Sequence, residues 1–138
     1  MELIVSDWTL AEASKFMAVE WPPYDAPFGI DGSQRQEIVL VATRGAPVGV
    51  ACGVALGGLG ELKQLLVRHE HARAGIGSEL LVAFERRCES LGCHKIRLET
   101  GAHQARPFYE RRGYKVATTL TNDRFGRDGY VMEKRLTG

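Results

Sequence analysis

The most constraining feature of this sequence is an apolar segment that ends at Val67 and leads, through a short polar turn, to a glycine pair at Gly75 and Gly77. After the glycines, apolar residues recur at helical spacing: Leu80, Leu81, Phe84, Cys88 and Leu91. The first amides of a helix lack partners within it, and the helix dipole favours negative charge at that end. Glycines also allow the main chain to approach a bulky anion. The segment therefore predicts a phosphate- or pyrophosphate-binding turn.

Two common phosphate motifs are absent from this turn. The dinucleotide fingerprint needs a third glycine, whereas Gly77 is followed by Ser-Glu-Leu-Leu, and no Gly-Lys-Ser or Gly-Lys-Thr of a P-loop occurs. Glycines at a helix start also serve turn geometry alone, which is the alternative interpretation of this pair. A phosphate ligand here must belong to another class of molecule.

Composition predicts a single globular domain over residues 1–138. The chain is 44% hydrophobic and 25% charged with a net charge of +1, which gives no indication of a nucleic-acid partner or a membrane surface. The pairs Arg86-Arg87 and Arg111-Arg112 are expected to be solvated. The N-terminus lacks a secretory signal, and the three cysteines have no metal-ligand spacing, so we expect reduced thiols, no metal and a cytoplasmic location.

Hydrophobic periodicity and turn residues predict a mixed α/β chain. A short strand is expected at 2–5, followed by a helix that begins with a capping box at Thr9 and is broken by the prolines after Trp21. A further helical piece is expected near 32–37. The remaining strands are expected at 38–43, 47–56, 61–67, 95–100, 114–120 and 130–136, with helices at 76–91 and 105–112. The strand–helix–strand unit around residues 61–100 predicts a parallel strand pair with a right-handed crossover.

Three segments, taken together, resemble the GNAT superfamily of acyl-CoA-dependent N-acetyltransferases. The first runs from Glu61 to Val67 and continues with Arg73-Ala74-Gly75-Ile76-Gly77; the second is 91–100; the third is 104–114, which carries Tyr109 and ends in Gly113-Tyr114. The resemblance implies a mixed, mostly antiparallel twisted sheet with helices on both faces and a central parallel strand pair. It also implies acetyl-CoA as co-substrate and a primary amine of a small molecule or protein as acceptor.

The resemblance assigns the donor site largely to main-chain groups. Residues Leu65, Leu66 and Val67 would pair with the pantetheine arm as an added strand does, and an amide of Leu66 or Val67 would polarise the thioester carbonyl. The pyrophosphate would be held by Arg73, Ala74, Gly75, Ile76, Gly77 and Ser78. One departure is Ala72, which stands where the family usually has Arg or Gln, and Arg73 next to it is the candidate replacement. Ala102 similarly replaces an asparagine that the family often has before the tyrosine.

The remaining site residues concern proton transfer and the acceptor. Tyr109 is the candidate general acid for the departing CoA sulfur, with plain helix packing as its alternative role. Glu61, Glu99 and His103 are candidates for the base that deprotonates the amine, each with a solvated or paired surface role as the alternative. A bulge in strand 61–67 would change which of its side chains share a face. The acceptor is expected to be bound by Trp21, Tyr24 and Asp25 of the Pro-broken loop and by His103, with Asp123 and Arg124 as further candidates. Core packing is the alternative role of Trp21.

Two other function classes stay open. One is a non-catalytic acyl-CoA-binding sensor or interaction module that has lost transfer activity, and the other is a phosphate-ligand-binding protein unrelated to CoA. By analogy, a homodimer is also plausible.

Overall fold

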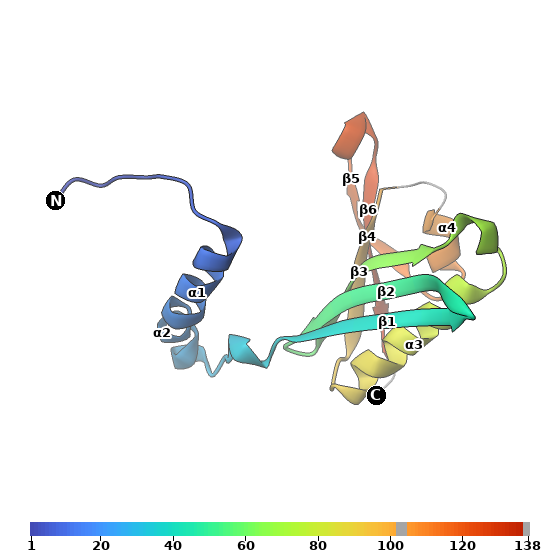
Figure 1. The fold of residues 1–138 in the computed structure, drawn as a ribbon, viewed down its shortest axis with the longest axis horizontal. Coiled ribbons are helices and arrows are strands. Elements are labelled where there is room, and N and C mark those ends of the chain that lie inside the picture. Colours follow the sequence, from blue (N-terminus) through green and yellow to red (C-terminus); the bar gives the residue numbers. More distant parts are fainter. Residues whose placement is uncertain (102–104, 137–138) are drawn as a thin grey trace. The chain divides into compact units, whose positions relative to one another are not determined.

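The computed structural model describes residues 1–101 and 105–136, and the chain divides into two compact units. The first unit is Met1–Gln34 and the second is Arg35–Gly138 (Figure 1). The single domain over residues 1–138 stays a prediction.

The N-terminal unit consists of short helices. Its elements are α1 (Leu10–Glu20), α2 (Pro22–Asp25) and the 3-10 turns η1 (Ala26–Phe28) and η2 (Gly32–Gln34). The predicted cap at the start of α1 is confirmed, since Thr9 Oγ accepts from the amide of Glu12 at 3.2 Å. The strand predicted at 2–5 is wrong, because residues 1–34 contain no strand with which it could form a ladder. The helical piece predicted near 32–37 is limited to η2, and a strand begins at Gln36.

The C-terminal unit is built on a six-stranded sheet with the order β1-β2-β3-β4-β6-β5 (Figure 1). Its strands are β1 (Gln36–Arg44), β2 (Ala46–Leu56), β3 (Leu59–Val67), β4 (Lys95–Thr100), β5 (Lys115–Leu120) and β6 (Gly129–Arg135). Its helices are α3 (Ile76–Ser90) and α4 (Ala105–Glu110), with 3-10 turns η3 (His69–His71) and η4 (Arg124–Gly126). All strand pairs are antiparallel except β3–β4, so the predicted mixed sheet with one parallel pair is confirmed.

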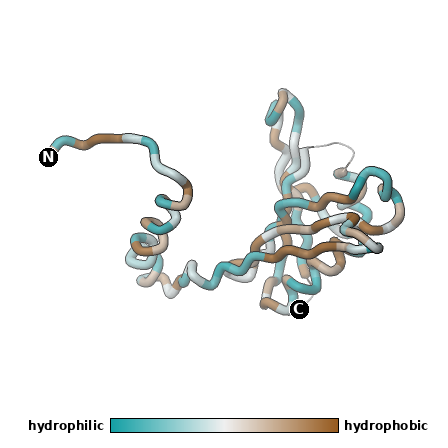
Figure 2. The backbone as a smooth tube through the Cα atoms, viewed as in Figure 1, coloured by the Kyte–Doolittle hydropathy of each residue, from teal (hydrophilic) through white to brown (hydrophobic). Residues whose placement is uncertain are grey.

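The core of this unit lies between the sheet and α3, which packs against β1, β2 and β3. Phe84 and Cys88 of α3 are fully buried, as their helical spacing predicts. Gly53 of β2 allows this close packing, because a Cβ there would lie 2.6 Å from the Phe84 ring and 2.1 Å from the carbonyl oxygen of Glu61. Apolar residues follow the strands beside α3 (Figure 2). Within the described residues, no helix has the length and apolar character needed to cross a membrane.

Candidate functional site

The two parallel strands at the centre of the sheet separate along their length. Register pairs join β3 to β4 only from Leu59–Lys95 to Leu62–Leu98, although β3 continues to Val67 and β4 to Thr100. In a strand, successive backbone amides point to opposite neighbours. Beyond Leu62, the amides of β3 that point toward β4 therefore have no strand partner there. This open edge is the kind of main-chain surface to which an extended ligand can add as a strand does.

A β-bulge at Lys63 sets the direction of the side chains along this open edge. Gln64 pairs with Cys52 and Leu62 pairs with Gly53, so Lys63 is the extra residue in β3. Because of the extra residue, Leu65 and Val67 contact the core, whereas Leu66 is exposed. Glu61 and Lys63 remain close, with Lys63 Nζ 3.0 Å from Glu61 Oε2. The backbone of Leu65, Leu66 and Val67 is thus presented without disrupting the core.

A cavity of about 610 Å³ opens between β3 and β4. It is lined by parts of β3, β4, α4, β6 and the loop that joins β5 to β6: Glu61, Leu62, Lys63, Gln64, Leu65, Arg97, Leu98, Glu99, Thr100, Gly101, Ala105, Tyr109, Asp123, Arg124, Arg127, Asp128, Gly129 and Val131. This volume suits a small organic ligand. The structure therefore brings both predicted carboxylates, Tyr109 and the start of the open edge to one cavity.

Tyr109 is the buried aromatic residue of this cavity. Its side chain is 8% exposed, and its ring packs edge-on against Phe108 and Tyr114, with centroid distances of 5.1 and 5.6 Å. Burial raises the pKa of the Tyr109 hydroxyl above its usual value. The hydroxyl therefore keeps its proton at neutral pH. A protonated phenol that lines a cavity can donate a hydrogen bond to a ligand bound there.

The two predicted carboxylates lie on neighbouring strands. Glu61 of β3 is in register with Arg97 of β4, and Glu99 follows two residues later on the same strand. Glu61 accepts a hydrogen bond from Lys63, whereas Glu99 is exposed. Both carboxylates line the cavity, together with Asp123 and Arg124. The third candidate base, His103, lies outside the described residues.

The predicted phosphate turn lies between η3 and α3. The backbone is left-handed at Arg73, with φ of 68°, and at Gly75, with φ of 81°. Gly75 is the N-cap of α3, and no side chain caps the first amides of that helix. A Cβ at Gly75 would enter open space, and one at Gly77 would lie 3.5 Å from the Phe108 ring. The amides at the start of α3 thus have no side-chain cap, as an anion site at a helix N-terminus requires.

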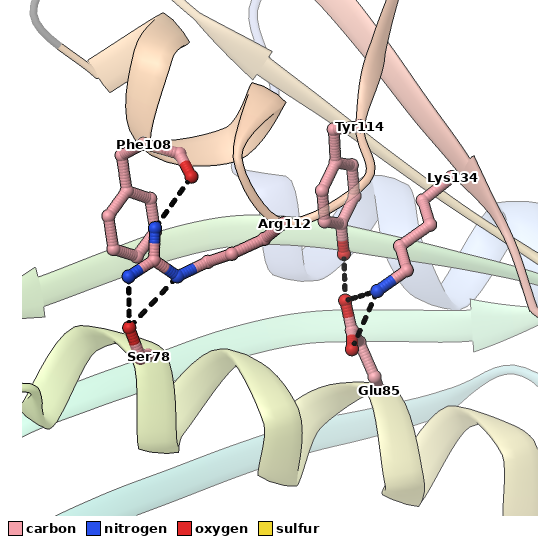
Figure 3. Close-up of polar contacts among 6 residues, drawn as sticks. All are labelled: Ser78, Glu85, Phe108, Arg112, Tyr114 and Lys134. Carbon is pink, nitrogen blue, oxygen red and sulfur yellow. Dashed lines mark hydrogen bonds and ion pairs between the residues drawn. The ribbon is translucent and has the colours of Figure 1, made fainter.

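Sequence reasoning missed a half-buried arginine at this turn. Arg112, expected to be solvated, donates from Nε to Ser78 Oγ at 2.9 Å and from Nη1 to the carbonyl oxygen of Phe108 at 2.8 Å (Figure 3). Its Nη2 also contacts Ser78 Oγ, and its guanidinium carbon lies 3.8 Å from the centre of the Phe108 ring. No local pattern marks this contact, because Ser78 and Arg112 are 34 residues apart. Arg111 and the Arg86-Arg87 pair are exposed, as expected.

A second polar cluster lies further along α3. Glu85 is 9% exposed and accepts a hydrogen bond from the Tyr114 hydroxyl at 2.8 Å. It also forms an ion pair with Lys134, whose Nζ lies 3.1 Å from Glu85 Oε2 (Figure 3). Burial, and then the nearby Glu85 carboxylate, raise the pKa of Tyr114 above its usual range. In this cluster the charges of Glu85 and Lys134 balance, and it joins α3 to β6.

The three cysteines are unpaired with one another. Cys88 and Cys93 are buried and Cys52 is half-buried, and all three are free thiols. Burial raises the pKa of the Cys88 thiol to about 12, which disfavours its nucleophilic thiolate form. Among the described residues, no group of three or more potential metal ligands comes together.

Comparison with known proteins identifies the family. Residues 3–114 match the model of the Acetyltransferase (GNAT) family. The chain belongs to the GNAT acetyltransferase family. No curated protein sequence matches it.

Several solved structures share the GNAT fold with this chain. A "putative acetyltransferase" from Agrobacterium tumefaciens is 24% identical, with a TM-score of 0.83 over 99% of this chain and 100% of that one. An acetyltransferase from Bacillus cereus ATCC 14579 is 23% identical, with a TM-score of 0.80 over 97% and 98%. A "putative acyl-CoA N-acyltransferase" from Klebsiella pneumoniae is 28% identical, with a TM-score of 0.62 over 94% and 92%.

The acyl-CoA used by GNAT proteins fits the geometry of this site. The open edge of β3 matches an extended pantetheine arm, and the uncapped amides at Gly75–Ser78 match a diphosphate. The roles of the individual residues stay predictions. So does the prediction that Trp21 and Tyr24 bind the acceptor. These two belong to the N-terminal unit, where their rings contact each other with centroids 6.3 Å apart.

Proposed function

We propose that this GNAT protein transfers an acetyl group from acetyl-CoA to a primary amine of a small molecule or protein. The observation that carries the proposal is the separation of β3 from β4 beside Tyr109, with the uncapped start of α3 following β3 in the chain. Together these features offer a main-chain edge, a proton donor and an anion site to one extended thioester. Acetyl-CoA, when bound, supplies an activated acyl carbon for attack by the amine.

Donor binding rests mainly on the backbone. Residues Leu65–Val67 would pair with the pantetheine arm, and 73–78 would hold the diphosphate. An amide of Leu66 or Val67 would donate to the thioester oxygen, an interaction worth about 3–4 kcal/mol when it forms in the transition state. The Lys63 bulge supports this role, because it leaves the side chains of Leu65 and Val67 in the core while the backbone stays accessible.

Proton transfer would involve Tyr109 and a carboxylate. The amine nitrogen forms a bond to the acyl carbon, the carbon–sulfur bond breaks, and the Tyr109 hydroxyl gives its proton to the departing sulfur. The amine gives up a proton to Glu61 or Glu99, directly or through water, and that proton restores the tyrosine by way of solvent. Holding a lysine-like amine neutral at pH 7 costs about 4.6 kcal/mol, so a nearby carboxylate is useful. Both carboxylates line the cavity that Tyr109 also lines.

The direct test measures CoA thiol release with acetyl-CoA and a panel of polyamines, aminoglycosides, amino acids and lysine peptides. We expect release that depends on at least one class of amine, with mass spectrometry finding the acetylated product. A reaction without amine controls for thioester hydrolysis. Tight acetyl-CoA binding without turnover on any amine would instead favour a non-catalytic acyl-CoA sensor or interaction module.

We also propose a cytoplasmic location and a possible homodimer. Three free thiols suit a reducing compartment. Fractionation of the host cell tests the location, and light scattering of the purified protein tests the oligomeric state.

A further inference from the structure

In the contact between Ser78 and Arg112, the serine hydroxyl accepts hydrogen bonds and keeps its own hydrogen available for donation. A hydroxyl has two acceptor positions and one hydrogen to donate. Two N–H groups of Arg112, on Nε and Nη2, both donate to Ser78 Oγ, so they use its acceptor positions (Figure 3). The hydroxyl hydrogen must therefore point away from the guanidinium. In the contacts of the described residues, Ser78 Oγ only accepts, and its hydrogen has no acceptor.

The charge of Arg112 is also uncompensated. Its hydrogen-bond acceptors are the Ser78 hydroxyl and the carbonyl oxygen of Phe108, which are neutral groups. None of the ion pairs formed within residues 1–101 and 105–136 includes Arg112. The guanidinium is half-buried and stacks on the Phe108 ring, so it is held in place beside the first turn of α3. A fixed, partly desolvated cation at a helix N-terminus favours an anionic ligand.

The turn before α3 also lacks a side chain that is usual for the family. Ala72 occupies the position at which the resemblance predicts Arg or Gln, and it cannot contact a phosphate through a charge. We infer that Arg112, reaching across from the end of α4, compensates: it holds the Ser78 hydroxyl as a donor toward the diphosphate of acyl-CoA and supplies the missing positive charge. The inference rests on the proposed function. Arg112 is a positioning residue in this account, because it acts partly through Ser78.

The test is calorimetric titration of CoA into the full chain and its variants. We expect Arg112→Met and Ser78→Ala each to raise the Kd for CoA about tenfold, as loss of a hydrogen bond to a charged group implies. In the double variant the Kd for CoA should rise much less than the product of the two single increases, because both substitutions remove the same Ser78–Arg112 contact. Arg112→Lys restores the charge but not the paired donors, so we expect it to recover part of the affinity.

Two controls separate this role from general damage. Arg111→Met removes the exposed neighbouring arginine and should keep the Kd for CoA within about twofold of the wild-type value. S-acetylpantetheine ends before the diphosphate, so its binding, followed by ligand-observed NMR, should be within about twofold in Arg112→Met. Thermal unfolding without ligand establishes that each variant is folded.

Four results would overturn the inference. A folded Arg112→Met with wild-type affinity for CoA would exclude the role, and so would an equal loss in Arg111→Met. An equal loss for S-acetylpantetheine would show that Arg112 acts only on the structure of the site. Wild-type protein that binds no CoA would overturn the proposed function as well, so the two failures are distinguishable.

Discussion

Helix α3 carries two polar clusters that differ in how their charges are satisfied. In the middle of the helix, Glu85 accepts from both Tyr114 and Lys134, so a buried carboxylate meets a cation and a hydroxyl donor (Figure 3). At its first turn, Ser78 accepts from Arg112, whose charge meets only neutral acceptors. The first cluster is complete without a ligand and the second is not. A balanced cluster of this kind stabilises the fold, whereas an unbalanced one is suited to binding.

The same contrast holds for two tyrosines that pack against each other. The rings of Tyr109 and Tyr114 are 5.6 Å apart and both are buried. Tyr114 donates to Glu85, whereas Tyr109 lines the cavity. Burial raises the pKa of both hydroxyls, so a raised pKa alone does not distinguish a structural tyrosine from a proton donor. The surroundings distinguish the two tyrosines, because Tyr114 donates to a buried carboxylate and Tyr109 lines a cavity.

The largest expected effect is on stability, from Lys134→Met. Removing this cation leaves the Glu85 carboxylate buried with only the Tyr114 hydroxyl, which should cost about 3 kcal/mol of unfolding free energy. Chemical denaturation measures this loss. Arg112→Met, in the ligand-directed cluster, should cost about 1 kcal/mol or less, because it leaves no buried charge unpaired. Equal losses in the two variants would remove the distinction between the clusters.

The two tyrosines provide the next comparison. Tyr109→Phe should lower kcat by about ten- to a thousandfold and leave stability near that of the wild type, since the ring is kept. Tyr114→Phe should lower the unfolding free energy by about 2 kcal/mol, because Glu85 loses a hydrogen bond, with a small effect on kcat. Steady-state kinetics and denaturation on both variants check this. A rate unchanged in Tyr109→Phe at every pH would exclude the tyrosine from the mechanism.

A smaller effect is expected on stability at alkaline pH. Burial raises the pKa of Tyr109, Tyr114 and Cys88 in the folded state, the last from 9.0 to about 12. The fold therefore binds these protons more tightly than the unfolded chain does. Their contribution is complete below pH 9 and is lost as pH rises from 9 toward 12. Denaturation at pH 8, 9.5 and 11 should show this decline.

Tyr114→Phe provides the matched comparison for this decline. In this variant the free energy of unfolding should fall less steeply with pH than in the wild type, because one titrating group is removed. Arg112→Met should keep the wild-type slope, since arginine does not titrate in this range. A Tyr114→Phe slope equal to that of the wild type would contradict the account.

The smallest effect is expected at Glu133, which pairs with Lys95 at 3.0 Å and Arg97 at 2.9 Å. Hydrogen bonds from Lys95 and then Arg97 lower the pKa of this carboxyl. The stabilisation is therefore present at neutral pH and is lost as pH falls through the lowered folded pKa. Glu133→Gln should cost about 1 kcal/mol at pH 7 and less at pH 3, by denaturation at both values. A cost independent of pH would contradict the charge-based explanation.

Much of the C-terminal unit could be predicted because its signals are local. The apolar spacing from Ile76 to Cys88 predicts the buried face of α3, and the strand predicted at 95–100 has the same bounds in the structure. The glycine pair predicts a turn before the helix, and Gly75 there has a left-handed backbone that glycine adopts without strain. The possibility of a bulge in β3 could be anticipated, but its position at Lys63 depends on the register with β2.

The rest depends on contacts between residues distant in the sequence. Arg112 beside Arg111 has the pattern of a solvated pair, and only the fold, which brings the end of α4 beside the first turn of α3, places one of them on Ser78. The same is true of Glu85. The sequence does not mark this glutamate as buried, and the fold brings it into contact with Tyr114 and Lys134, which are distant from it in the chain. The strand predicted at 2–5 failed because β-propensity without a partner strand does not make a ladder.

A crystal structure of the acetyl-CoA complex tests the central claim most directly. The account predicts the diphosphate within hydrogen-bond distance of the Gly75–Ser78 amides and the Ser78 hydroxyl. It also predicts the pantetheine arm along Leu65–Val67 and the sulfur beside the Tyr109 hydroxyl. Density for acetyl-CoA at another surface, with the opening between β3 and β4 left empty, would contradict it.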